Sequence, residues 1–514
     1  MNKMITDLLD DPHQRAWREN VRPTGWKNPT PAGRYNLVVI GAGAAGLVTS
    51  AIAASLGARV ALIERERMGG DCLNAGCVPS KAILRAARTW ADLGHAAAFG
   101  IRFPDGTPRD FGAVMARMRR LRAEISPADS ADRYQKMGVD LFFGEGRFLS
   151  GHQIEVGGQT LAFSRAVICT GTRPTVPDIP GLKAAGFLTN ETLFDMVTLP
   201  LRLVVIGGGP IGCEMAQAFA RFGSCVTLIQ KSARILPRDD ADAAAIVQRH
   251  LLKDGVRILV ASHVTRVEQA GNARRVYVEK AEGGGEEMIE ANTILVAVGR
   301  TPNVEGLGLE AIGVAADRRT GVQVNAALQT THPRLFAAGD ICSAHKFTHL
   351  ADAMAQVVIQ NALFPHPLGI GLAQIDRQVV PWCTYTTPEI AQVGLTAETA
   401  ALQGISVDTF TTPMAENDRA RLDGETDGFV RVHVKRGSDR LVGATIVAAH
   451  AGEMIGEITL AIKNNLGLSA IGGTIHPYPT QSEAIRKTAI LWRKGRLTDG
   501  RKRFLQRWFA WTRS

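Results

Sequence analysis

The sequence predicts an α/β protein in which two Rossmann-like domains precede a C-terminal α+β domain. A glycine-rich turn at residue 41 follows an apolar strand and opens a helix of small residues, and the same arrangement returns at residue 207. Two such strand–turn–helix units are typical of two dinucleotide-binding domains. After about residue 376 the pattern changes to longer strands, FVRVHV and LVGATIV, and a helix over 452–465. The length of 514 residues suits about three domains at roughly 100–200 residues each.

The composition is that of a globular protein. Hydrophobic residues make up 45% of the chain and charged residues 21%, which excludes wholesale disorder. No apolar run reaches the roughly 18 residues that a membrane-spanning helix needs, and the N-terminus lacks the apolar core of a signal peptide. Seven cysteines are too few for a disulfide scaffold in a chain of this length, so we expect reduced thiols and a cytoplasmic protein.

The positive charge is concentrated at the C-terminus. Residues 486–514 contain ten Lys or Arg and one acid, which accounts for nearly all of the net charge of +10. A nucleic-acid-binding protein would spread such charge over a folded face, so no nucleic-acid partner is expected. The tail, residues 491–514, could lie as an amphipathic helix in an anionic membrane surface, or its aromatic rings could pack on the protein while its charges stay solvated. The apolar side chains that its cations surround are Phe504, Leu505, Trp508, Phe509 and Trp511.

The first glycine turn predicts a dinucleotide site. Strand 35–40 leads into Gly41-Ala-Gly-Ala-Ala-Gly46. In such a turn the first glycine makes the tight bend, the second lets the backbone approach a pyrophosphate, and the third lets the helix pack on the strand. Glu64, 23 positions after Gly41, can accept hydrogen bonds from both ribose hydroxyls of an adenosine without a 2′-phosphate. The residues of the turn assigned to this site are Gly41, Gly43, Ala44, Ala45 and Gly46.

The second turn predicts a different coenzyme. Strand 201–206 leads into Gly207-Gly-Gly-Pro-Ile-Gly212, and the position of Glu64 is taken by Gln230, followed by Lys231 and Arg234. A neutral residue beside cations suits a 2′-phosphate, so we predict that this site prefers NADPH to NADH. If the two cations are merely solvated, the site accepts either coenzyme. The residues of the turn assigned to this site are Gly207, Gly209, Ile211 and Gly212.

The stretch Gly69-Gly-Asp-Cys72-Leu-Asn-Ala-Gly-Cys77-Val-Pro-Ser-Lys81 is the most specific motif of the chain. Two cysteines separated by four residues, with glycine at 70 and 76, can close a small disulfide across the first turn of a helix. A helix N-terminus lowers thiol pKa values, so the reduced pair would hold a reactive thiolate. The spacing argues against a metal site, because no matching Cys-x-x-Cys or His partner follows nearby.

Together these motifs resemble the pyridine nucleotide–disulfide oxidoreductase family, which includes glutathione reductase, dihydrolipoyl dehydrogenase and mercuric reductase. The resemblance covers about residues 35–490 and implies that the first dinucleotide is FAD. It implies that Cys77 lies nearest the flavin and that Cys72 exchanges with substrate. It also implies that Lys81, beside the flavin, pairs with Glu214, since a buried lysine needs such a partner. The other residues assigned to the FAD site are Arg65, Gly70, Asp71, Gly146, Thr170, Gly171, Gly339 and Asp340, the last matching the aspartate that binds the ribityl chain; Gly299 is assigned to the NADPH site.

The motifs and the resemblance also suggest domain limits. We expect an N-terminal extension (1–34), a discontinuous FAD-binding domain (35–165 and 300–376), an NAD(P)-binding domain (166–299), a dimerisation domain (377–490) and the basic aromatic tail (491–514). The resemblance implies a homodimer in which the last domain completes the partner's active site.

The acid–base motif of that last domain departs from the one in disulfide reductases, His-Pro-Thr-x-x-Glu. The matching stretch, Ile475-His-Pro-Tyr478-Pro-Thr-Gln-Ser-Glu483, puts Tyr478 in the base position and keeps Glu483. A phenol with a pKa of about 10 is a poor proton acceptor at neutral pH, but it can donate a hydrogen bond to a thiolate or touch a soft metal ion. His476 either reaches the site by another route or is a structural histidine.

Mercuric reductase has Tyr in this place too, although it usually ends in a vicinal Cys pair, which Ala510-Trp-Thr-Arg-Ser514 lacks. Residues 1–71 also contain no Cys for an N-terminal metal-delivery domain. We expect a flavoenzyme that passes electrons from NADPH through FAD and the cysteine pair to a soft metal ion such as Hg(II) or to a small disulfide, with no structural metal. The alternatives are a dihydrolipoyl dehydrogenase, which usually uses NAD and a His base, and a membrane-surface redox module recruited by the tail.

Overall fold

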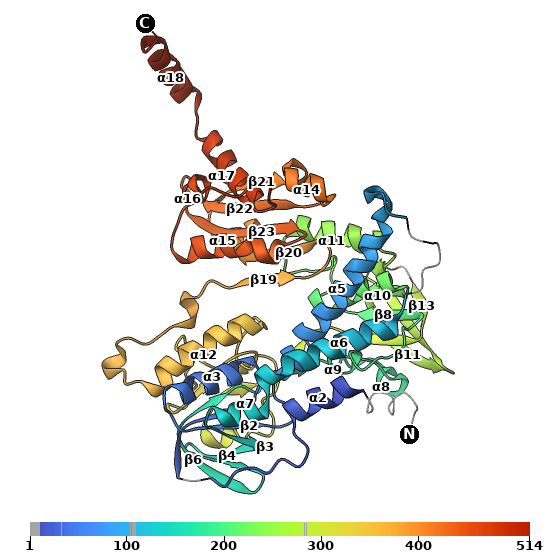
Figure 1. The fold of residues 1–514 in the computed structure, drawn as a ribbon, viewed down its shortest axis with the longest axis vertical. Helices are drawn as coiled ribbons and strands as arrows, with labels where there is room; N and C mark the ends of the chain where they lie inside the picture. Colours follow the sequence, from blue (N-terminus) through green and yellow to red (C-terminus); the bar gives the residue numbers. More distant parts are fainter. Residues whose placement is uncertain are drawn as a thin grey trace. The chain divides into compact units, whose positions relative to one another are not determined.

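The computed structural model describes residues 11–31, 33–102, 104, 109–281, 283 and 285–513. Residues 1–10 and 32 of the expected N-terminal extension and Ser514 of the tail lie outside these ranges. The chain divides into two compact units, Met1–Ala233 with Asp254–Gln378 and Arg234–Lys253 with Val379–Ser514. Each unit is built of helices and sheets (Figure 1), and the predicted fold class is confirmed: two Rossmann-like domains and a C-terminal α+β domain.

The first Rossmann-like domain is built on a sheet with the strand order β3–β2–β1–β6–β5–β4, in which β18 also pairs with β6. Strands β1, β2, β3, β6 and β18 are parallel, so their carboxyl ends meet at one edge. Helices α3 (Ala44–Ser55) and α12 (Thr348–Leu363) pack against each other beside this sheet. The strands are β1 (Arg34–Ile40), β2 (Val60–Glu64), β3 (Val139–Phe143), β4 (Gly146–Ser150), β5 (Gln153–Val156), β6 (Gln159–Ile168) and β18 (Leu335–Ala337).

The second Rossmann-like domain has a parallel sheet with the order β10–β9–β8–β14, and its core includes Val204, Ile229 and Ile294. Helix α10 (Pro210–Phe222) follows β8 directly. An antiparallel sheet, β11–β12–β13, and the pair β7–β15 complete this part of the unit. The strands are β7 (Thr172–Pro174), β8 (Arg202–Ile206), β9 (Cys225–Ile229), β10 (Arg257–Leu259), β11 (Ser262–Ala270), β12 (Ala273–Lys280), β13 (Glu286–Ala291), β14 (Thr293–Val296) and β15 (Arg300–Pro302).

Glycine is required at the two turns because the chain reverses without room for a side chain. Gly41 has a φ of +101° and Gly207 a φ of +112°, a conformation that L side chains rarely adopt. A Cβ on Gly46 would collide with the carbonyl oxygen of Gly41, and one on Gly212 would collide with that of Gly207. The two turns therefore share one local geometry, which brings each helix N-terminus against the end of its strand.

The thiol motif occupies two consecutive helices after β2, α4 (Gly70–Asn74) and α5 (Cys77–Gly94). Helix α5 packs against α10 and α6 (Phe111–Ile125), and α6 also packs against α2 (Pro12–Val21) of the N-terminal extension. Residues 100–165, for which the sequence predicts no particular element, contribute α6, α7 (Ala131–Lys136) and the strands from β3 into β6.

The second unit is an antiparallel sheet, β19–β20–β23–β22–β21, with helices packed against it. Its core joins Val432 and Ile446 of the sheet to Ile458 of α15 (Ala451–Lys463) and Ile485 of α17 (Glu483–Gly495). Strands β22 and β23 and helix α15 are the elements predicted over this region. The strands are β19 (Pro381–Thr384), β20 (Glu389–Gly394), β21 (Val407–Pro413), β22 (Phe429–Lys435) and β23 (Leu441–Ala448); the further helices are α11 (Ala241–Lys253), α13 (Ala397–Leu402), α14 (Asp418–Asp423) and α16 (Leu468–Gly473).

The basic aromatic tail forms helix α18 (Asp499–Trp511), whose first turn is capped by the Thr498 hydroxyl. No residue of α18 is buried, so packing of its rings on the protein body, one of the two expectations, is not seen in the single chain. Among the described residues, no helix combines the length and the apolar character needed to cross a bilayer.

Candidate active site

The first glycine turn presents an open backbone cradle at the N-terminus of α3. Gly43 is the N-cap of α3, and the atom nearest to where its Cβ would stand is the Cα of Gly70, 3.7 Å away. Behind the turn, the Glu64 carboxylate accepts the N–H groups of Ala42 and Glu66, each at 2.7 Å. Burial raises the pKa of Glu64, and these two N–H groups oppose the rise. The turn, the helix N-terminus and the carboxylate fit the pyrophosphate and ribose of a dinucleotide.

The second turn repeats this geometry with an amide in place of the carboxylate. Gln230 Oε1 accepts the N–H of Gly208 at 2.9 Å, as Glu64 accepts that of Ala42, and each pair is separated by 22 residues. Gln230 is 9% exposed, so it faces the turn and not bulk solvent. The two sites thus differ by one charge at equivalent positions.

The cations predicted beside Gln230 lie in different surroundings. The Lys231 side chain is exposed. The Arg234 guanidinium donates to the carbonyl oxygens of Leu236 at 2.9 Å and Pro237 at 3.0 Å, and Arg234 belongs to the second unit. Within the first unit, Lys231 is therefore the cation that follows Gln230.

Cys72 and Cys77 are both free thiols. The hydrogen bond that Cys72 donates is the main cause that lowers the pKa of Cys77 to about 6; burial opposes this shift, while the Thr348 hydroxyl and the charge of Lys81 add to it. Thr348 Oγ1, in the first turn of α12, lies 3.5 Å from Cys77 Sγ. The same sulfur–sulfur hydrogen bond, together with burial, raises the pKa of Cys72. Near neutral pH the pair therefore holds one thiolate, on Cys77.

The lysine of the thiol motif forms an ion pair with α10. Lys81 Nζ lies 2.9 Å from Glu214 Oε2, and Glu214 is 4% exposed. A carboxylate buried to this extent needs a paired cation, because loss of the partner would leave an uncompensated charge. Helices α5 and α10 thus place the positive charge of Lys81 near the thiols and pair it with the negative charge of Glu214.

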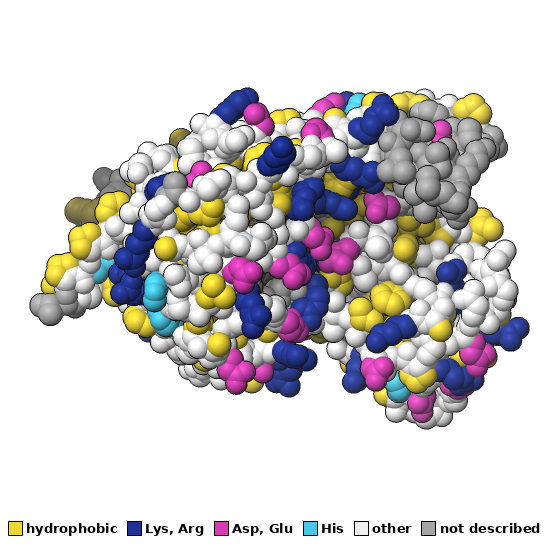
Figure 2. Space-filling view, turned by 90° about the horizontal axis from the view of Figure 1, so that it is seen from below, with side chains coloured by type: hydrophobic (Ala, Val, Ile, Leu, Met, Phe, Trp, Pro, Cys, Tyr) yellow, Lys and Arg dark blue, Asp and Glu magenta, His cyan; other side chains and the backbone are white. Residues whose placement is uncertain are grey.

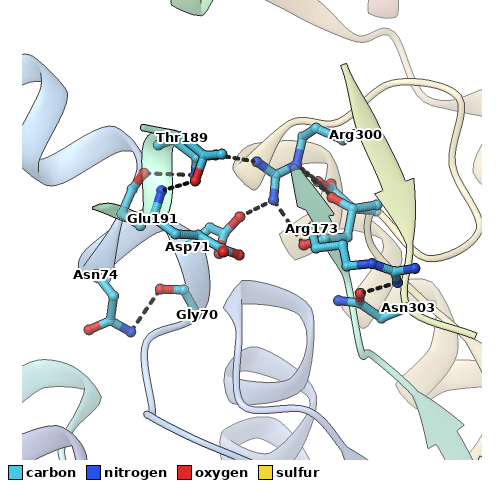
Figure 3. A network of polar contacts seen from close by, with 12 residues as sticks. Gly70, Asp71, Asn74, Arg173, Thr189, Glu191, Arg300 and Asn303 are labelled. Atoms are coloured by element: carbon cyan, nitrogen blue, oxygen red, sulfur yellow. Dashed lines mark hydrogen bonds and ion pairs between the residues drawn. The ribbon is translucent and has the colours of Figure 1, made fainter. Parts of the chain in front are cut away.

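A polar network around Arg300, a residue that the sequence analysis does not assign to the site, includes Asp71 of the thiol motif (Figure 3). Arg300 forms an ion pair with Asp71 and donates to the Thr172 hydroxyl at 2.6 Å and the Thr172 carbonyl at 2.9 Å. Its Nε also lies 4.0 Å from Asp340 Oδ2. The only sequence signal for Arg300 is its position directly after Gly299, at the end of an apolar strand.

Asp340 follows β18 at the sheet edge where the predicted FAD residues meet. Burial raises the pKa of its carboxyl, while Arg300, Lys346 and the Thr172 hydroxyl at 3.2 Å oppose the rise. A carboxylate in this position can accept hydrogen bonds from the hydroxyl groups of a ribityl chain.

Three other residues assigned to the FAD site, Thr170, Gly146 and Arg65, lie in different surroundings. Thr170 exchanges two hydrogen bonds of 2.9 Å with Asn303, which fixes the loop after β6. Gly146 opens β4 beside Ile63 of β2. Arg65, by contrast, is largely exposed and lies 3.5 Å from Glu66 in a surface ion pair.

Tyr478 and Glu483, from the C-terminal motif, lie in the second unit. Tyr478 is 69% exposed, and its hydroxyl donates to Asp418 Oδ2 at 3.2 Å, which raises the pKa of the phenol. The phenol therefore stays protonated at neutral pH and acts as a hydrogen-bond donor. Glu483 Oε2 lies 3.7 Å from Lys487 Nζ, one turn further along α17.

The His476 imidazole is engaged at both of its nitrogens. Its Nε2 lies 3.0 Å from Glu457 Oε1 and its Nδ1 lies 3.1 Å from the Thr474 carbonyl oxygen, and the side chain is 6% exposed. A histidine held in this way is suited to fix the loop that carries Tyr478.

Charged side chains of both signs share the face of the molecule that Figure 2 shows. On the face in Figure 2, Lys and Arg side chains are interspersed with Asp and Glu and form no continuous basic field. The described part of the chain contains no group of three or more His, Cys, Asp or Glu side chains arranged to hold a metal ion.

A two-nucleotide α/β scaffold with a thiol pair beside its first glycine turn defines a class, the nucleotide-dependent thiol–disulfide oxidoreductases. Residues 35–357 match the family model described as "Pyridine nucleotide-disulphide oxidoreductase". Residues 380–489 match the model of its dimerisation domain. The chain belongs to the pyridine nucleotide-disulphide oxidoreductase family.

Its relatives include enzymes with different electron partners. The chain is 33% identical over 503 residues to the mercuric reductase of Staphylococcus aureus, covering 95% of this chain and 90% of the relative. It is 36% identical over 464 residues to the dihydrolipoyl dehydrogenase of Thermus scotoductus, covering 88% and 96%. A solved Cu(II) complex of the HOCl-induced flavoprotein disulfide reductase RclA from Escherichia coli superposes with a TM-score of 0.78 at 28% identity, covering 90% of this chain and all of that one.

The protein is therefore an FAD-binding, NAD(P)H-dependent oxidoreductase with a dimerisation domain, as the sequence predicts. The cradle at Gly41–Gly46, Glu64 and Asp340 fit FAD, and the turn at Gly207–Gly212 with Gln230 fits the nicotinamide coenzyme. When bound, FAD supplies the two-electron link between the nicotinamide and the thiol pair.

Proposed function

We propose that the enzyme is an NADPH-dependent reductase whose thiol pair delivers electrons to a soft metal ion or a small disulfide. The observation that carries this proposal is the hydrogen-bonded pair itself. Cys77 has a pKa of about 6 and Cys72 a raised one, so the reduced pair offers one thiolate and one thiol at neutral pH. Lys81, balanced by Glu214, supplies a positive charge that favours the thiolate.

The thiol chemistry balances for both classes of acceptor. Two electrons and one proton convert a Cys72–Cys77 disulfide to the Cys77 thiolate and the Cys72 thiol. With Hg(II), both sulfurs bind the ion and the Cys72 proton leaves; the two thiolates then give up two electrons, which reduces the metal to Hg(0) and forms the Cys72–Cys77 disulfide again. With a disulfide substrate, the Cys72 sulfur attacks one substrate sulfur as its proton passes to the leaving thiolate, which departs as a thiol; the Cys77 thiolate then attacks Cys72, releases the second substrate thiolate and forms the Cys72–Cys77 disulfide again.

The soft-metal acceptor is favoured by the residue in the acid–base position. Tyr478 is exposed and its phenol stays protonated, because its neighbour Asp418 raises its pKa. It can donate a hydrogen bond to a sulfur or approach a metal held between sulfurs, but it cannot take a thiol proton at neutral pH as a histidine can. We propose that the enzyme is a homodimer in which Tyr478 completes the active site of the other subunit.

The direct test is turnover of one holoenzyme preparation with NADPH and four acceptors: Hg(II), Cu(II), oxidised glutathione and lipoamide. We expect the highest kcat/KM with one of the two metal ions, and loss of that turnover in Cys72→Ser and Cys77→Ser. Highest efficiency with lipoamide would assign the dihydrolipoyl dehydrogenase alternative instead. Turnover that survives both serine variants would contradict the proposed electron path.

A second candidate function, recruitment to an anionic membrane surface, is favoured by helix α18. Phe504, Trp508 and Trp511 stand at positions i, i+4 and i+7 and so share one face of the helix. They are 67%, 49% and 69% exposed, and Leu505 and Phe509 widen this face. The remaining circumference carries most of the cations of the helix and its C-terminus, Lys502, Arg503, Arg507 and Arg513, and the only acid of the segment is Asp499 in the first turn.

The aromatic face of α18 and the cations around the rest of the helix suit binding to an anionic bilayer surface. Aromatic side chains seat in the interface between headgroups and acyl chains, while each cation near anionic lipid adds about 1 kcal/mol. The face is too exposed in the single chain to be explained by packing within it.

Vesicle co-sedimentation tests this recruitment. The full-length enzyme should bind vesicles of phosphatidylserine and phosphatidylcholine, and binding should weaken with salt and be lost on Arg503→Glu with Arg507→Glu, while NADPH turnover stays unchanged. The matched control reverses the charge of Arg318 and Arg436, whose side chains are 82% and 70% exposed outside the tail. Equal binding of the tail variant and the control would overturn the proposal, as would a tail deletion that changes the oligomeric mass without changing vesicle binding.

A further inference from the structure

The N-terminal helix α2 reaches the segment between the two reactive cysteines. Trp17, in the middle of α2, is 2% exposed, and its indole Nε1–H donates to Asn74 Oδ1 at 2.9 Å. Asn74 lies between Cys72 and Cys77 in the chain. Helix α2 precedes the residues that match the family model, which begin at 35.

Hydrogen bonds of Asn74 hold the segment that carries the two cysteines. Its side-chain amide donates to the carbonyl oxygens of Met68 at 2.9 Å and Gly70 at 2.8 Å. The main-chain carbonyl oxygen of Asn74 accepts a hydrogen bond from the Arg122 guanidinium of α6 at 3.0 Å. With the bond from Trp17, four hydrogen bonds hold this one residue, and they come from three separate stretches of the chain.

Arg122 contacts both Asn74 and helix α2. It is 2% exposed, and its guanidinium lies 3.9 Å from the centre of the Trp17 ring and donates to Gln14 Oε1 of α2 at 2.8 Å. The start of α2 is held to the same helix α6 by the ion pair between Asp11 and Arg119 at 2.5 Å. A buried guanidinium with these partners is expensive to displace, so α2 is fixed against α6 at both places.

We propose that α2 is a clamp on the segment 68–77, and that Trp17 and Arg122 are positioning residues that hold Asn74 and, through it, the spacing of the two sulfurs. This proposal rests on the proposed function of the cysteine pair. The thiolate at Cys77 depends first on a hydrogen bond from Cys72, which requires the two sulfurs to stay close. A looser segment lengthens that bond, so the clamp favours the thiolate without touching either sulfur.

The experiment measures the thiolate directly in the reduced holoenzyme. The rate constant for alkylation by iodoacetamide is recorded against pH for the wild type and for Trp17→Phe, which removes the indole N–H and keeps an aromatic ring over Arg122. We expect the midpoint of the profile to move to higher pH and alkylation at pH 6 to fall about threefold. Arg122→Gln, which loses the charge over the ring, should move the midpoint in the same direction.

The matched control is Trp26→Phe. Trp26 belongs to the same N-terminal extension, but its Nε1 has no hydrogen-bond partner among the described residues, so its profile should equal the wild type. A Trp17→Phe enzyme with a lowered Tm and an unchanged midpoint would overturn the clamp and leave a purely structural contact. Failure of the proposed function is distinguished by Cys77→Ser: if that variant keeps the low-pH alkylation midpoint, the thiolate is not on Cys77.

Discussion

The two nucleotide sites differ in the residue at one equivalent position, which is Glu64 in the first site and Gln230 in the second. Glu64 and Gln230 each accept the N–H of the second residue of their glycine turn. The backbone geometry is thus the same, and the difference is the negative charge that Glu64 brings near a ribose and Gln230 does not. We attribute the proposed preference for NADPH to this absence of charge and to Lys231 beside it.

Gln230→Glu tests that assignment. A carboxylate at 230 would repel a 2′-phosphate, so the ratio of kcat/KM for NADPH to that for NADH should fall by about tenfold, which corresponds to about 1.4 kcal/mol. Steady-state kinetics with both coenzymes measure the ratio, and FAD content serves as the control because Glu64 is untouched. An unchanged ratio would mean that residue 230 does not select the coenzyme.

The site residues that the sequence predicts are those that share a local motif. Cys72 and Cys77 lie within one short stretch, and Glu64 follows a glycine turn at a set distance, so spacing points to them, whereas the role of Lys81 in the same stretch is implied by the resemblance to the family. Arg300 and Thr348 come from more than 200 residues away in the chain and meet the thiol motif only after folding. Neither belongs to a motif, and no rule of spacing would have found them.

Elements with a strong local pattern were likewise predictable. The strands that precede the glycine turns are continuous apolar runs, and each turn packs so closely on the helix that follows that a Cβ at Gly46 or Gly212 would collide with the backbone. The position of helix α11 was not predictable. In the sequence it lies between β9 and β10 of the second Rossmann-like sheet, but it belongs to the second unit. Its place depends on tertiary contacts with β20 and β23, which no local pattern encodes.

Gly212→Ala tests the geometry of the second turn. A Cβ there would collide with the carbonyl oxygen of Gly207, so the turn must open and we expect the KM for NADPH to rise at least about tenfold. FAD content should stay normal, because the turn at Gly41 is separate. Gly456→Ala in α15, where a Cβ would meet nothing within 4 Å, is the control and should leave KM unchanged. A normal KM in Gly212→Ala would show that the turn does not contact the coenzyme.

At the scale of the whole molecule, we propose that the C-terminal motif acts in a site shared between subunits. Tyr478 is exposed on the second unit, and residues 380–489 match a dimerisation domain. His476, fixed by Glu457 and Thr474, holds the loop that presents Tyr478. These features suit a tyrosine that faces another subunit.

Hybrid dimers test the shared site. When Cys77→Ser and Tyr478→Phe subunits are unfolded together and reassembled in equal amounts, half of the dimers are hybrids in which one site combines an intact Cys77 with an intact Tyr478. Turnover should therefore reach about a quarter of the wild type and exceed the mean of the two parents. Sites built within single subunits would show no gain on mixing.

The most direct test of the electron path is a pH titration of the holoenzyme reduced anaerobically with NADPH, followed by the long-wavelength absorbance of a thiolate against flavin. Because the pKa of Cys77 is lowered to about 6, the band should be present above that pH and disappear as the pH falls through it. Cys77→Ser should abolish the band and Cys72→Ser should retain it. A band that persists in Cys77→Ser would contradict the account.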